Sequence, residues 1–358
     1  MAFLDIKNVR IAGMATAVPK NVIHNKDVMQ ANNESDINSF IEQIGISERR
    51  NSSVLTEADL QVLAAERVLS DLGWEKDSVD AIICVTLTPD YPLPINACLV
   101  QDRLGLSKEC YAQDICMGCS GWVYGLSVLA TLLRDGDVKR GLLLVGECKM
   151  NWGLDRNALL FGHAGCATAL EYEPGNEGFQ FNLGTDGSGY DAVIMPNSGM
   201  RNMKYDEELI KEFENPERQL SMEAKMKNLD VFSFSVTRVP KTINELCEHF
   251  GIDYKKQDYL VLHQANKSIN QHIVKKMGVE PSKAISSIEH FGNTLSASIP
   301  ITITTQLKGK IEGKPTSFIC CGFGVGLSWG TVSFTTKDIV ISDLVEVEDN
   351  QFENLTWA

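Results

Sequence analysis

The stretch Ala112–Leu133 (AQDICMGCSGWVYGLSVLATLL) contains an apolar segment of helical length with no charged residue after Asp114. A helix that is apolar on every side is predicted to be buried on every side. A short β-like run precedes it, and a small turn with two thiols, Cys116 and Cys119, joins the two. Cys119 falls where the helix should begin, so we expect backbone N–H groups and the helix dipole to lower its pKa from about 8.5 towards neutrality. The stretch therefore predicts a buried, ionised thiol that a substrate reaches through a tunnel.

The order of expected strands and helices repeats in the second half of the chain. The expected helix Val239–Phe250 is followed by GIDYKKQDYLVLHQ, much as the helix Ala58–Gly73 is followed by GWEKDSVDAIICVT. The small, apolar run Thr294–Leu307 then takes the place of the first apolar helix. Strands that alternate with helices indicate an α/β architecture with largely parallel, buried strands. Two halves of similar order indicate a duplicated, layered fold.

This repeat divides the chain into four parts. Residues 1–175 are expected to form an N-terminal half that carries the thiol, and residues 231–340 a C-terminal half. Between them, residues 176–230 form a connecting segment, whose part from Pro196 to Asp230 is rich in Lys, Glu, Met and Asn and is typical of an exposed helical insertion or lid. Residues 341–358 are expected to be a C-terminal tail.

Composition excludes several classes of partner. A formal net charge of −14 argues against nucleic acid or an anionic membrane as the main partner. The chain has no run of about 18 apolar residues, and its first residues lack the features of a signal peptide. Most of the ten cysteines lie in apolar runs, which is typical of reduced, buried thiols. We therefore expect a cytoplasmic protein without disulfides.

Three residues with suitable chemistry meet if the two halves superpose. Cys119 and Asn293 then occupy equivalent places at the starts of the two central helices, and His263 lies at the end of a buried strand, where open α/β sheets form their sites. Cysteine is suited to a thioester intermediate. An imidazole and an amide can donate hydrogen bonds to a thioester carbonyl that becomes an enolate. The Gly-rich turn GFGVG can add backbone N–H groups for an acyl oxyanion.

Four motifs, DICMGCSGW, LHQANKSI, HFGNTLSASIP and GFGVGLSWG, resemble in order and spacing the signatures of β-ketoacyl-acyl-carrier-protein synthase III. The resemblance covers about residues 8 to 336. It implies a thiolase-like fold, a duplicated α-β-α-β-α layered sandwich that is normally a homodimer. It also implies a decarboxylative Claisen condensation between an acyl-cysteine and malonyl-ACP, the malonyl thioester of acyl carrier protein (ACP). No permanently bound cofactor or metal is expected, and acyl-CoA or acyl-ACP is the expected acyl donor.

The resemblance assigns roles to individual residues. Cys119 is the acyl nucleophile, and His263 and Asn293 stabilise the enolate that forms when malonyl-thioester loses CO₂. The backbone N–H groups of Cys119 and Val325 form the oxyanion hole. The residues implied in binding are Leu93 and Phe323 for the acyl pocket (Leu93 in the pocket of the partner subunit), Arg156 and Asn266 for coenzyme A, and Lys267, Lys275 and Lys276 for carrier-protein docking.

The sequence also departs from the family pattern where members hold coenzyme A. A Trp and an Arg usually precede the Gly-Ile-x-x-Arg-Arg motif, and this chain has Ser39 or Phe40 and Gln43 there. An Arg after the HQAN motif, which the family uses for carrier-protein docking, is Ser268 here. The FGDGA motif reads FGHAG, with His163 in place of the acid. The identity of the acyl donor and of the pathway therefore stays open.

Three alternatives also stay open. The chain can be a thiolase-fold acyltransferase that passes its acyl group to an alcohol, amine or sugar, with His263 as the base. It can be a non-catalytic subunit retained for its dimer surface. The C-x-x-C spacing of Cys116 and Cys119 is also compatible with a redox or zinc site, although a second ligand pair is missing. We expect His163 and His290 to be structural.

Overall fold

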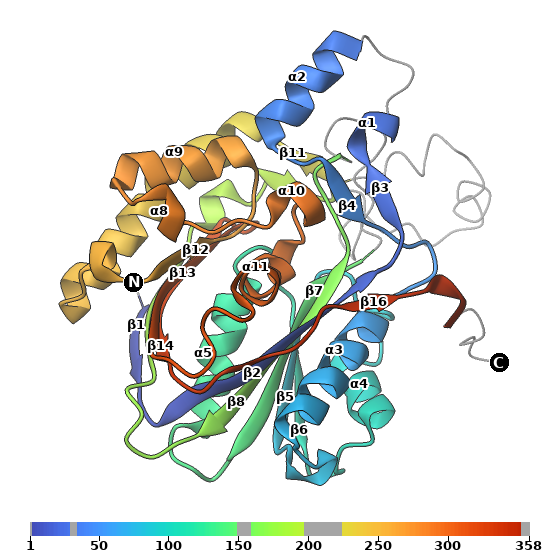
Figure 1. The fold of residues 1–358 in the computed structure, drawn as a ribbon, viewed down its shortest axis with the longest axis vertical. Helices are drawn as coiled ribbons and strands as arrows, with labels where there is room; N and C mark the ends of the chain where they lie inside the picture. Colours follow the sequence, from blue (N-terminus) through green and yellow to red (C-terminus); the bar gives the residue numbers. More distant parts are fainter. Residues whose placement is uncertain (1, 29–33, 149–158, 197–223, 352–358) are drawn as a thin grey trace.

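The computed structural model of the protein describes residues 2–28, 34–148, 159–196 and 224–351. Two mixed β-sheets lie face to face and run through the molecule (Figure 1). The first sheet has the strand order β15-β2-β8-β7-β5-β6, with β16 also paired to β2. Its strands are β2 (Val9–Pro19), β5 (Ala81–Val85), β6 (Tyr111–Ile115), β7 (Arg140–Glu147), β8 (Ala164–Tyr172), β15 (Val340–Ile341) and β16 (Val345–Val347).

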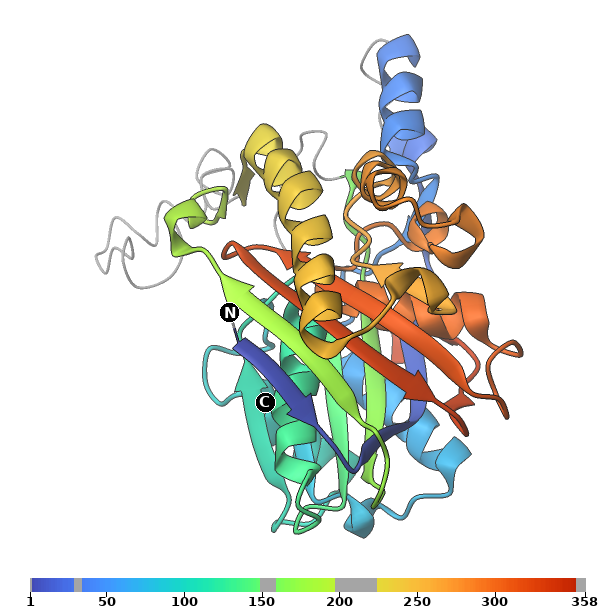
Figure 2. The same cartoon turned by 90° about the vertical axis from the view of Figure 1, so that its left-hand side faces the viewer.

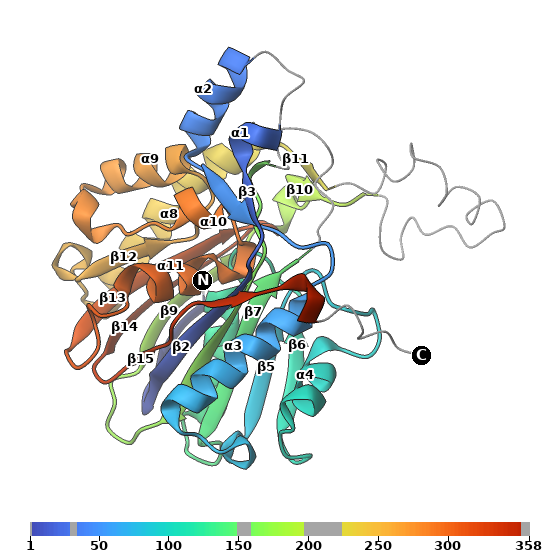
Figure 3. The same ribbon diagram turned by 45° about the vertical axis from the view of Figure 1, so that its right-hand side comes forward.

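The second sheet has the strand order β1-β9-β14-β13-β12. Its strands are β1 (Ala2–Ile6), β9 (Phe179–Thr185), β12 (Tyr259–Leu262), β13 (Thr316–Gly324) and β14 (Ser328–Thr336). Two small ribbons lie at the end of the molecule that carries α1 and α2 (Figure 3). They pair β3 (Val22–His24) with β4 (Glu48–Arg50), and β10 (Val193–Ile194) with β11 (Lys225–Met226).

Helices form three further layers around the sheets (Figures 1 and 2). The central layer consists of α5 (Gly121–Leu133) and α11 (Ser298–Leu307), and one hydrophobic cluster joins both helices to the facing sides of both sheets. The outer face of the first sheet packs against α3 (Glu57–Leu72) and α4 (Asn96–Leu104). The outer face of the second sheet packs against α8 (Asn228–Phe250) and α9 (Lys267–Met277). This α-β-α-β-α order confirms the predicted thiolase-like fold.

Three further α-helices lie at one end of these layers. They are α1 (Asn25–Val28), α2 (Glu34–Ile44) and α10 (Ile288–Phe291). Local sequence explains where several of the longer helices begin and end. The Thr56 side chain accepts a hydrogen bond from the Asp59 N–H group and Asp59 accepts one from Thr56, which forms a capping box for α3. Asn266 caps α9 through the Ile269 N–H group, and Gly278 ends α9 with φ of 63°.

The structure corrects some expectations about the strands. The sheets are mixed, with five parallel and five antiparallel strand pairs in the two large sheets, so they are not largely parallel. One cause is the short turn between β13 and β14, because a tight turn can join only antiparallel neighbours.

The halves also exchange strands. β1, from the N-terminal half, pairs with β9 in the second sheet, and β9 itself lies in the segment that we expected to connect the halves. The expected tail contributes β16 to the first sheet, where Val345 pairs with Ala17. Strand pairing depends on residues far away in the chain, so the local pattern did not reveal it. The part of the expected lid between residues 197 and 223 lies outside the described residues.

Helix α8 starts eleven residues earlier than expected and contains Pro240. Proline cannot donate the backbone hydrogen bond of a helix interior, which is why the pattern favoured a later start. The ten cysteines are free thiols, but Cys98 is exposed rather than buried. In the part of the chain that the structure describes, no helix is both long and apolar enough to cross a membrane.

Candidate active site

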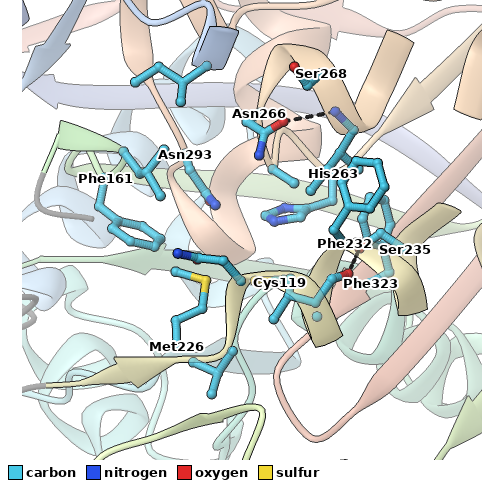
Figure 4. A pocket seen from close by; sticks show the side chains of 18 of the residues that line it. Cys119, Phe161, Met226, Phe232, Ser235, His263, Asn266, Ser268, Asn293 and Phe323 are labelled. Atoms are coloured by element: carbon cyan, nitrogen blue, oxygen red, sulfur yellow. Dashed lines mark hydrogen bonds between the residues drawn. The ribbon is translucent and has the colours of Figure 1, made fainter. Parts of the chain in front are cut away.

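A cavity of about 330 Å³ lies at the end of the central layer where the turns before α5 and α11 meet. Cys119, His263 and Asn293 all line it. Figure 4 shows the side chains of His263 and Asn293 directed towards the same space, with Cys119 beside them. The structure thus brings together three residues that are up to 174 positions apart in the chain.

Cys119 lies one residue before Ser120, the N-cap of α5, and its side chain is packed against the turn between β13 and β14. A Cβ added at Gly324 would lie 2.7 Å from both Cβ and Sγ of Cys119, so only glycine fits there. The Ser120 hydroxyl lies 2.6 Å from the Ser328 hydroxyl, and Ser328 donates to the carbonyl oxygen of Val325 over 2.7 Å. This chain of hydrogen bonds fixes the turn beside the sulfur.

The expectation of an ionised thiol is wrong for the resting protein. The pKa of Cys119 is raised to about 12, chiefly by burial and in smaller part by the nearby Glu147 carboxyl, although the backbone N–H groups of Val325 and Cys119 lower it. Cys119 is only 8% exposed, and the desolvation of a thiolate outweighs the stabilisation from two N–H groups. Helix α5 also begins only at Gly121, two residues further on. The resting sulfur is therefore a thiol that two N–H groups face.

His263 follows β12 and is buried, and its backbone N–H donates to the carbonyl of Cys321 over 2.8 Å. Its Nδ1 lies 2.6 Å from the hydroxyl oxygen of Ser298, the first residue of α11. Its ring stands edge-on to Phe323, with centroids 5.4 Å apart and planes at 87°. Burial lowers the pKa of His263 to about 3, so the imidazole is neutral at physiological pH.

Asn293 is fixed by the backbone around it. Its N–H donates to the carbonyl of Leu160 over 2.7 Å, and its own carbonyl accepts from Gly162 over 3.1 Å. Its Oδ1 accepts the N–H of Leu295 over 2.9 Å, and Leu295 has a left-handed φ of 49°, which is uncommon for this residue type. Because Oδ1 is engaged in this way, the Nδ2 end of the amide is the end directed at the cavity (Figure 4).

The walls of the cavity are mainly apolar. Phe161, Met226 and Phe232 lie around the space in front of the three polar side chains (Figure 4). Phe323 lines the cavity as expected, and Asn266 lines it with its Oδ1 engaged by the Ile269 N–H group. Sequence reasoning missed Met226 and Phe232, because the first falls in the expected insertion and the second precedes the expected start of its helix. Phe40, Gln43 and Ser268, where the chain departs from the family pattern, also line the cavity.

Other predicted binding residues lie elsewhere. Leu93 is 83% exposed and does not line the cavity of its own chain, so its role in a partner's pocket stays a prediction. Arg156 lies outside the described residues. The three lysines do not form one patch: Lys276 donates to the carbonyl of Val236 on α8, whereas Lys267 and Lys275 border a groove with α2 and α10.

The residues expected to be structural have partners. His163 accepts a hydrogen bond at Nδ1 from the Ser52 N–H group over 3.2 Å, and His290 Nδ1 lies 3.2 Å from a Glu48 carboxylate oxygen. Cys116 is exposed, while Cys119 is buried. Within the described ranges, no group of three or more His, Cys, Asp or Glu side chains could hold a metal ion.

Two sheets around paired central helices, with a cysteine, a histidine and an asparagine in one cavity, define the class of thiolase-like condensing enzymes. Residues 113–187 match the family described as 3-oxoacyl-[acyl-carrier-protein (ACP)] synthase III, and residues 247–336 match the C-terminal part of that family. The chain belongs to the β-ketoacyl-[acyl-carrier-protein] synthase III family, and it is an acyl-transferring condensing enzyme.

Individual relatives match over nearly the whole chain. A β-ketoacyl-[acyl-carrier-protein] synthase III from Symbiobacterium thermophilum is 32% identical, with 92% of this chain and 98% of the relative covered. One from Clostridium perfringens is 30% identical over 91% of this chain and 98% of the relative. The crystal structure of a 3-oxoacyl-(acyl-carrier protein) synthase from Burkholderia xenovorans LB400 is similar with a TM-score of 0.88, 34% identity and coverage of 97% and 99%.

Proposed function

We propose that Cys119, His263 and Asn293 carry out a decarboxylative Claisen condensation, in which an acyl group on Cys119 reacts with malonyl-ACP to give a β-ketoacyl-thioester. The observation that carries this proposal is the convergence of the three side chains on one largely apolar cavity. The printed names of the relatives, β-ketoacyl-[acyl-carrier-protein] synthase III, agree with this chemistry.

The first half-reaction loads Cys119. Its sulfur attacks the carbonyl carbon of an acyl-thioester, and the oxyanion that forms is held by the N–H groups of Cys119 and Val325, the two groups that lower the pKa of the resting thiol. The neutral imidazole of His263 in the same cavity takes the thiol proton. The bond to the carrier sulfur then breaks, and the leaving thiolate receives that proton.

The second half-reaction uses the amide and the imidazole. Malonyl-thioester loses CO₂, and the electron pair of the broken C–C bond forms an enolate whose oxygen accepts hydrogen bonds from Asn293 Nδ2 and a His263 ring N–H. The enolate carbon attacks the acyl carbonyl on Cys119, a new C–C bond forms, and the bond to Sγ breaks. The thiolate of Cys119 then regains a proton, which completes the cycle.

The substrates and assembly follow from surface features. The acyl donor is acyl-CoA or acyl-ACP. Lys267 and Lys275 on α9 border a surface groove and can contact an acidic carrier protein. The exposed apolar residues Tyr91, Leu93 and Ile95 and the edge strand β6 support a homodimer. The protein works in the cytoplasm and needs no permanently bound cofactor.

The test incubates the protein with an acyl-thioester and malonyl-ACP labelled in its free carboxyl group. We expect acylation of Cys119 by mass spectrometry, release of labelled CO₂, and a β-ketoacyl product of the summed mass. Asn293→Ala is expected to accumulate the acyl adduct without product. Transfer of the acyl group to an alcohol or amine without release of CO₂ would instead identify an acyltransferase and contradict the proposal.

A further inference from the structure

A buried carboxyl group, Glu147, lies close to the site but does not line the cavity. It is the last residue of β7 and is 2% exposed. Its two oxygens accept the Leu87 N–H over 2.9 and 3.1 Å and the hydroxyls of Thr86 and Thr88 over 3.0 Å each. The Ser296 hydroxyl lies 3.5 Å from the other side of the same carboxylate. All four donors are uncharged, so hydrogen bonds alone hold this carboxyl group.

The partners of Glu147 touch both reactive turns. The Leu87 side chain packs on Gly118, where an added Cβ would lie 2.9 Å from Leu87 Cδ1, and Gly118 directly precedes Cys119. Ser296 directly follows Leu295, whose N–H fixes the amide of Asn293. Glu147 therefore joins the turn that carries the nucleophile to the turn that carries the amide, and these turns come from different halves of the chain.

The charge of Glu147 also bears on the thiol. Burial raises the pKa of Glu147 to about 8, although its four donors lower it. As a carboxylate it raises the pKa of Cys119 and of the nearby Cys116. The other titratable group that faces it is Glu57 on α3, whose pKa burial raises well above its usual range and on which Asp90 also acts. The raised pKa of Glu57 favours its uncharged form beside Glu147.

We propose that Glu147 is a positioning residue that ties the Cys119 turn to the Asn293 turn, and that loss of its proton opposes ionisation of Cys119. The protonated carboxyl group is then the form that favours acylation, and the thiolate fraction of Cys119 rises less steeply with pH where Glu147 loses its proton. This inference rests on the proposed function only for the role of Cys119 as the nucleophile. The ionisation of Cys119 can be measured without any acyl substrate.

The first experiment measures the rate of iodoacetamide alkylation of Cys119 from pH 6.5 to 9.5 by peptide mass spectrometry. In Glu147→Gln the amide keeps an acceptor for Leu87 but has no charge to gain. We expect equal rates in this variant and the wild type at pH 6.5, and a rate about tenfold higher in the variant at pH 9.5. The exposed control Glu109→Gln should follow the wild type. A ratio that does not change with pH, or that falls, overturns the proposed charge effect.

The wild type alone provides a second reading if the variant does not fold. In a plot of the base-10 logarithm of the alkylation rate against pH, the slope should be below one around pH 8, where Glu147 loses its proton. At lower and at higher pH the slope should be one. A straight line of unit slope overturns the charge effect. This result is independent of condensation. The proposed function fails instead if the wild type forms no β-ketoacyl product, or if product formation survives Cys119→Ala.

The second experiment tests positioning. Glu147→Ala removes the acceptor, and we expect kcat for condensation to fall about tenfold or more at pH 7. Glu147→Gln should restore kcat to within about threefold of the wild type. Ser296→Ala removes one hydrogen bond without a change in charge, so it should lower kcat about threefold. Because the Ser296 hydroxyl lowers the pKa of Glu147, the shallow part of the alkylation profile should also move to slightly higher pH. Wild-type kcat in both alanine variants overturns the positioning role.

Discussion

The central helices α5 and α11 occupy corresponding places between the sheets, but the turns before them hold their reactive groups differently. Close packing fixes Cys119. A Cβ added to Gly324 would lie 2.7 Å from the Cys119 Sγ, and one added to Gly322 would lie 2.9 Å from the Cys119 carbonyl oxygen. Hydrogen bonds fix Asn293, through Leu160, Gly162 and Leu295. The reactive atom of the first half is thus positioned mainly by shape, and that of the second half mainly by polar contacts.

The helices themselves show the same difference. The hydroxyls of α11 reach neighbouring elements: Ser298 contacts His263, Thr302 contacts Ser287 over 2.7 Å, and Thr304 contacts Thr16 over 2.7 Å. In α5 most side chains are apolar, and among the described residues only two of them form hydrogen bonds to the sheets, Tyr124 with the Gly184 carbonyl and Trp122 with the Thr168 hydroxyl. Burial favours the uncharged form of both reactive groups, because it raises the pKa of Cys119 and lowers the pKa of His263. The resting site is therefore neutral, and charge arises only during reaction.

The largest effect is expected at the nucleophile. Cys119→Ala removes the thiol that lines the cavity, so acyl loading and condensation should fall more than about 10³-fold. Mass spectrometry and product formation measure the two steps. The matched control is Cys116→Ala, an exposed thiol of the same turn, whose activity should stay within about threefold of the wild type. Comparable losses in both variants would contradict the assignment.

The side chains of His263 and Asn293 should determine the rate of decarboxylation in the second half-reaction. His263→Ala and Asn293→Ala each remove a donor to the enolate oxygen, so we expect release of CO₂ to fall about 10²- to 10³-fold in each. Acyl loading of Cys119 should persist in Asn293→Ala, and quenched-flow mass spectrometry can follow it. If Asn293→Ala lost loading and decarboxylation equally, the two turns would not have the separate roles proposed here.

Packing around the sulfur offers a direct test of positioning by shape. Gly324→Ala adds a methyl group against Cys119 and should lower kcat about 10²-fold by displacing the thiol. Gly187→Ala serves as the control, because nothing lies within 4 Å of the added Cβ there. Activity and thermal unfolding are measured together. An active Gly324→Ala protein would show that the turn moves freely and that close packing does not set the geometry.

A smaller effect is expected from the contact that orients the imidazole. Ser298→Ala removes the hydroxyl beside Nδ1 of His263, and decarboxylation should slow about tenfold, with acyl loading less affected. Thr305→Ala is the matched control on the same helix, because that hydroxyl bonds to the carbonyl of Ile301 in its own helix. Equal rates in Ser298→Ala and the wild type would remove the proposed role of this hydrogen bond.

The smallest expected effect is on stability. The folded protein holds the pKa of His263 at about 3, and the unfolded chain at about 6.5, so the unfolded state binds the extra proton between these values. Stability is therefore lost as the pH falls below about 6.5. From pH 6 to pH 5 the free energy of unfolding should fall by about 1 kcal/mol more in the wild type than in His263→Gln, as measured by urea denaturation. An equal fall in both proteins would show that His263 is charged in the folded state.

The predictions from sequence were most accurate where the signal was local. The helix expected at Ala58–Gly73 is present as α3, Glu57–Leu72, and α5 begins at Gly121, two residues after Cys119. The pattern also placed His263 at a strand end and Asn293 before the second central helix. The sequence shows an acidic residue, Glu147, at the end of the apolar run RGLLLVGE, which is unusual for a buried strand. Nothing local indicated that Leu87 and Ser296 would donate hydrogen bonds to it.

The sequence by itself determined the alternation of strands and helices, the buried character of the central helix and the residue types that can do acyl chemistry, because apolar periodicity and turn residues act over a few positions. Only the tertiary structure decided which strands pair, as with β1 and β9, and which protonation states the site holds. Cys119 lies near a helix start, which favours a thiolate, yet burial raises its pKa. Desolvation sums over all neighbours in space, and those neighbours come from both halves of the chain.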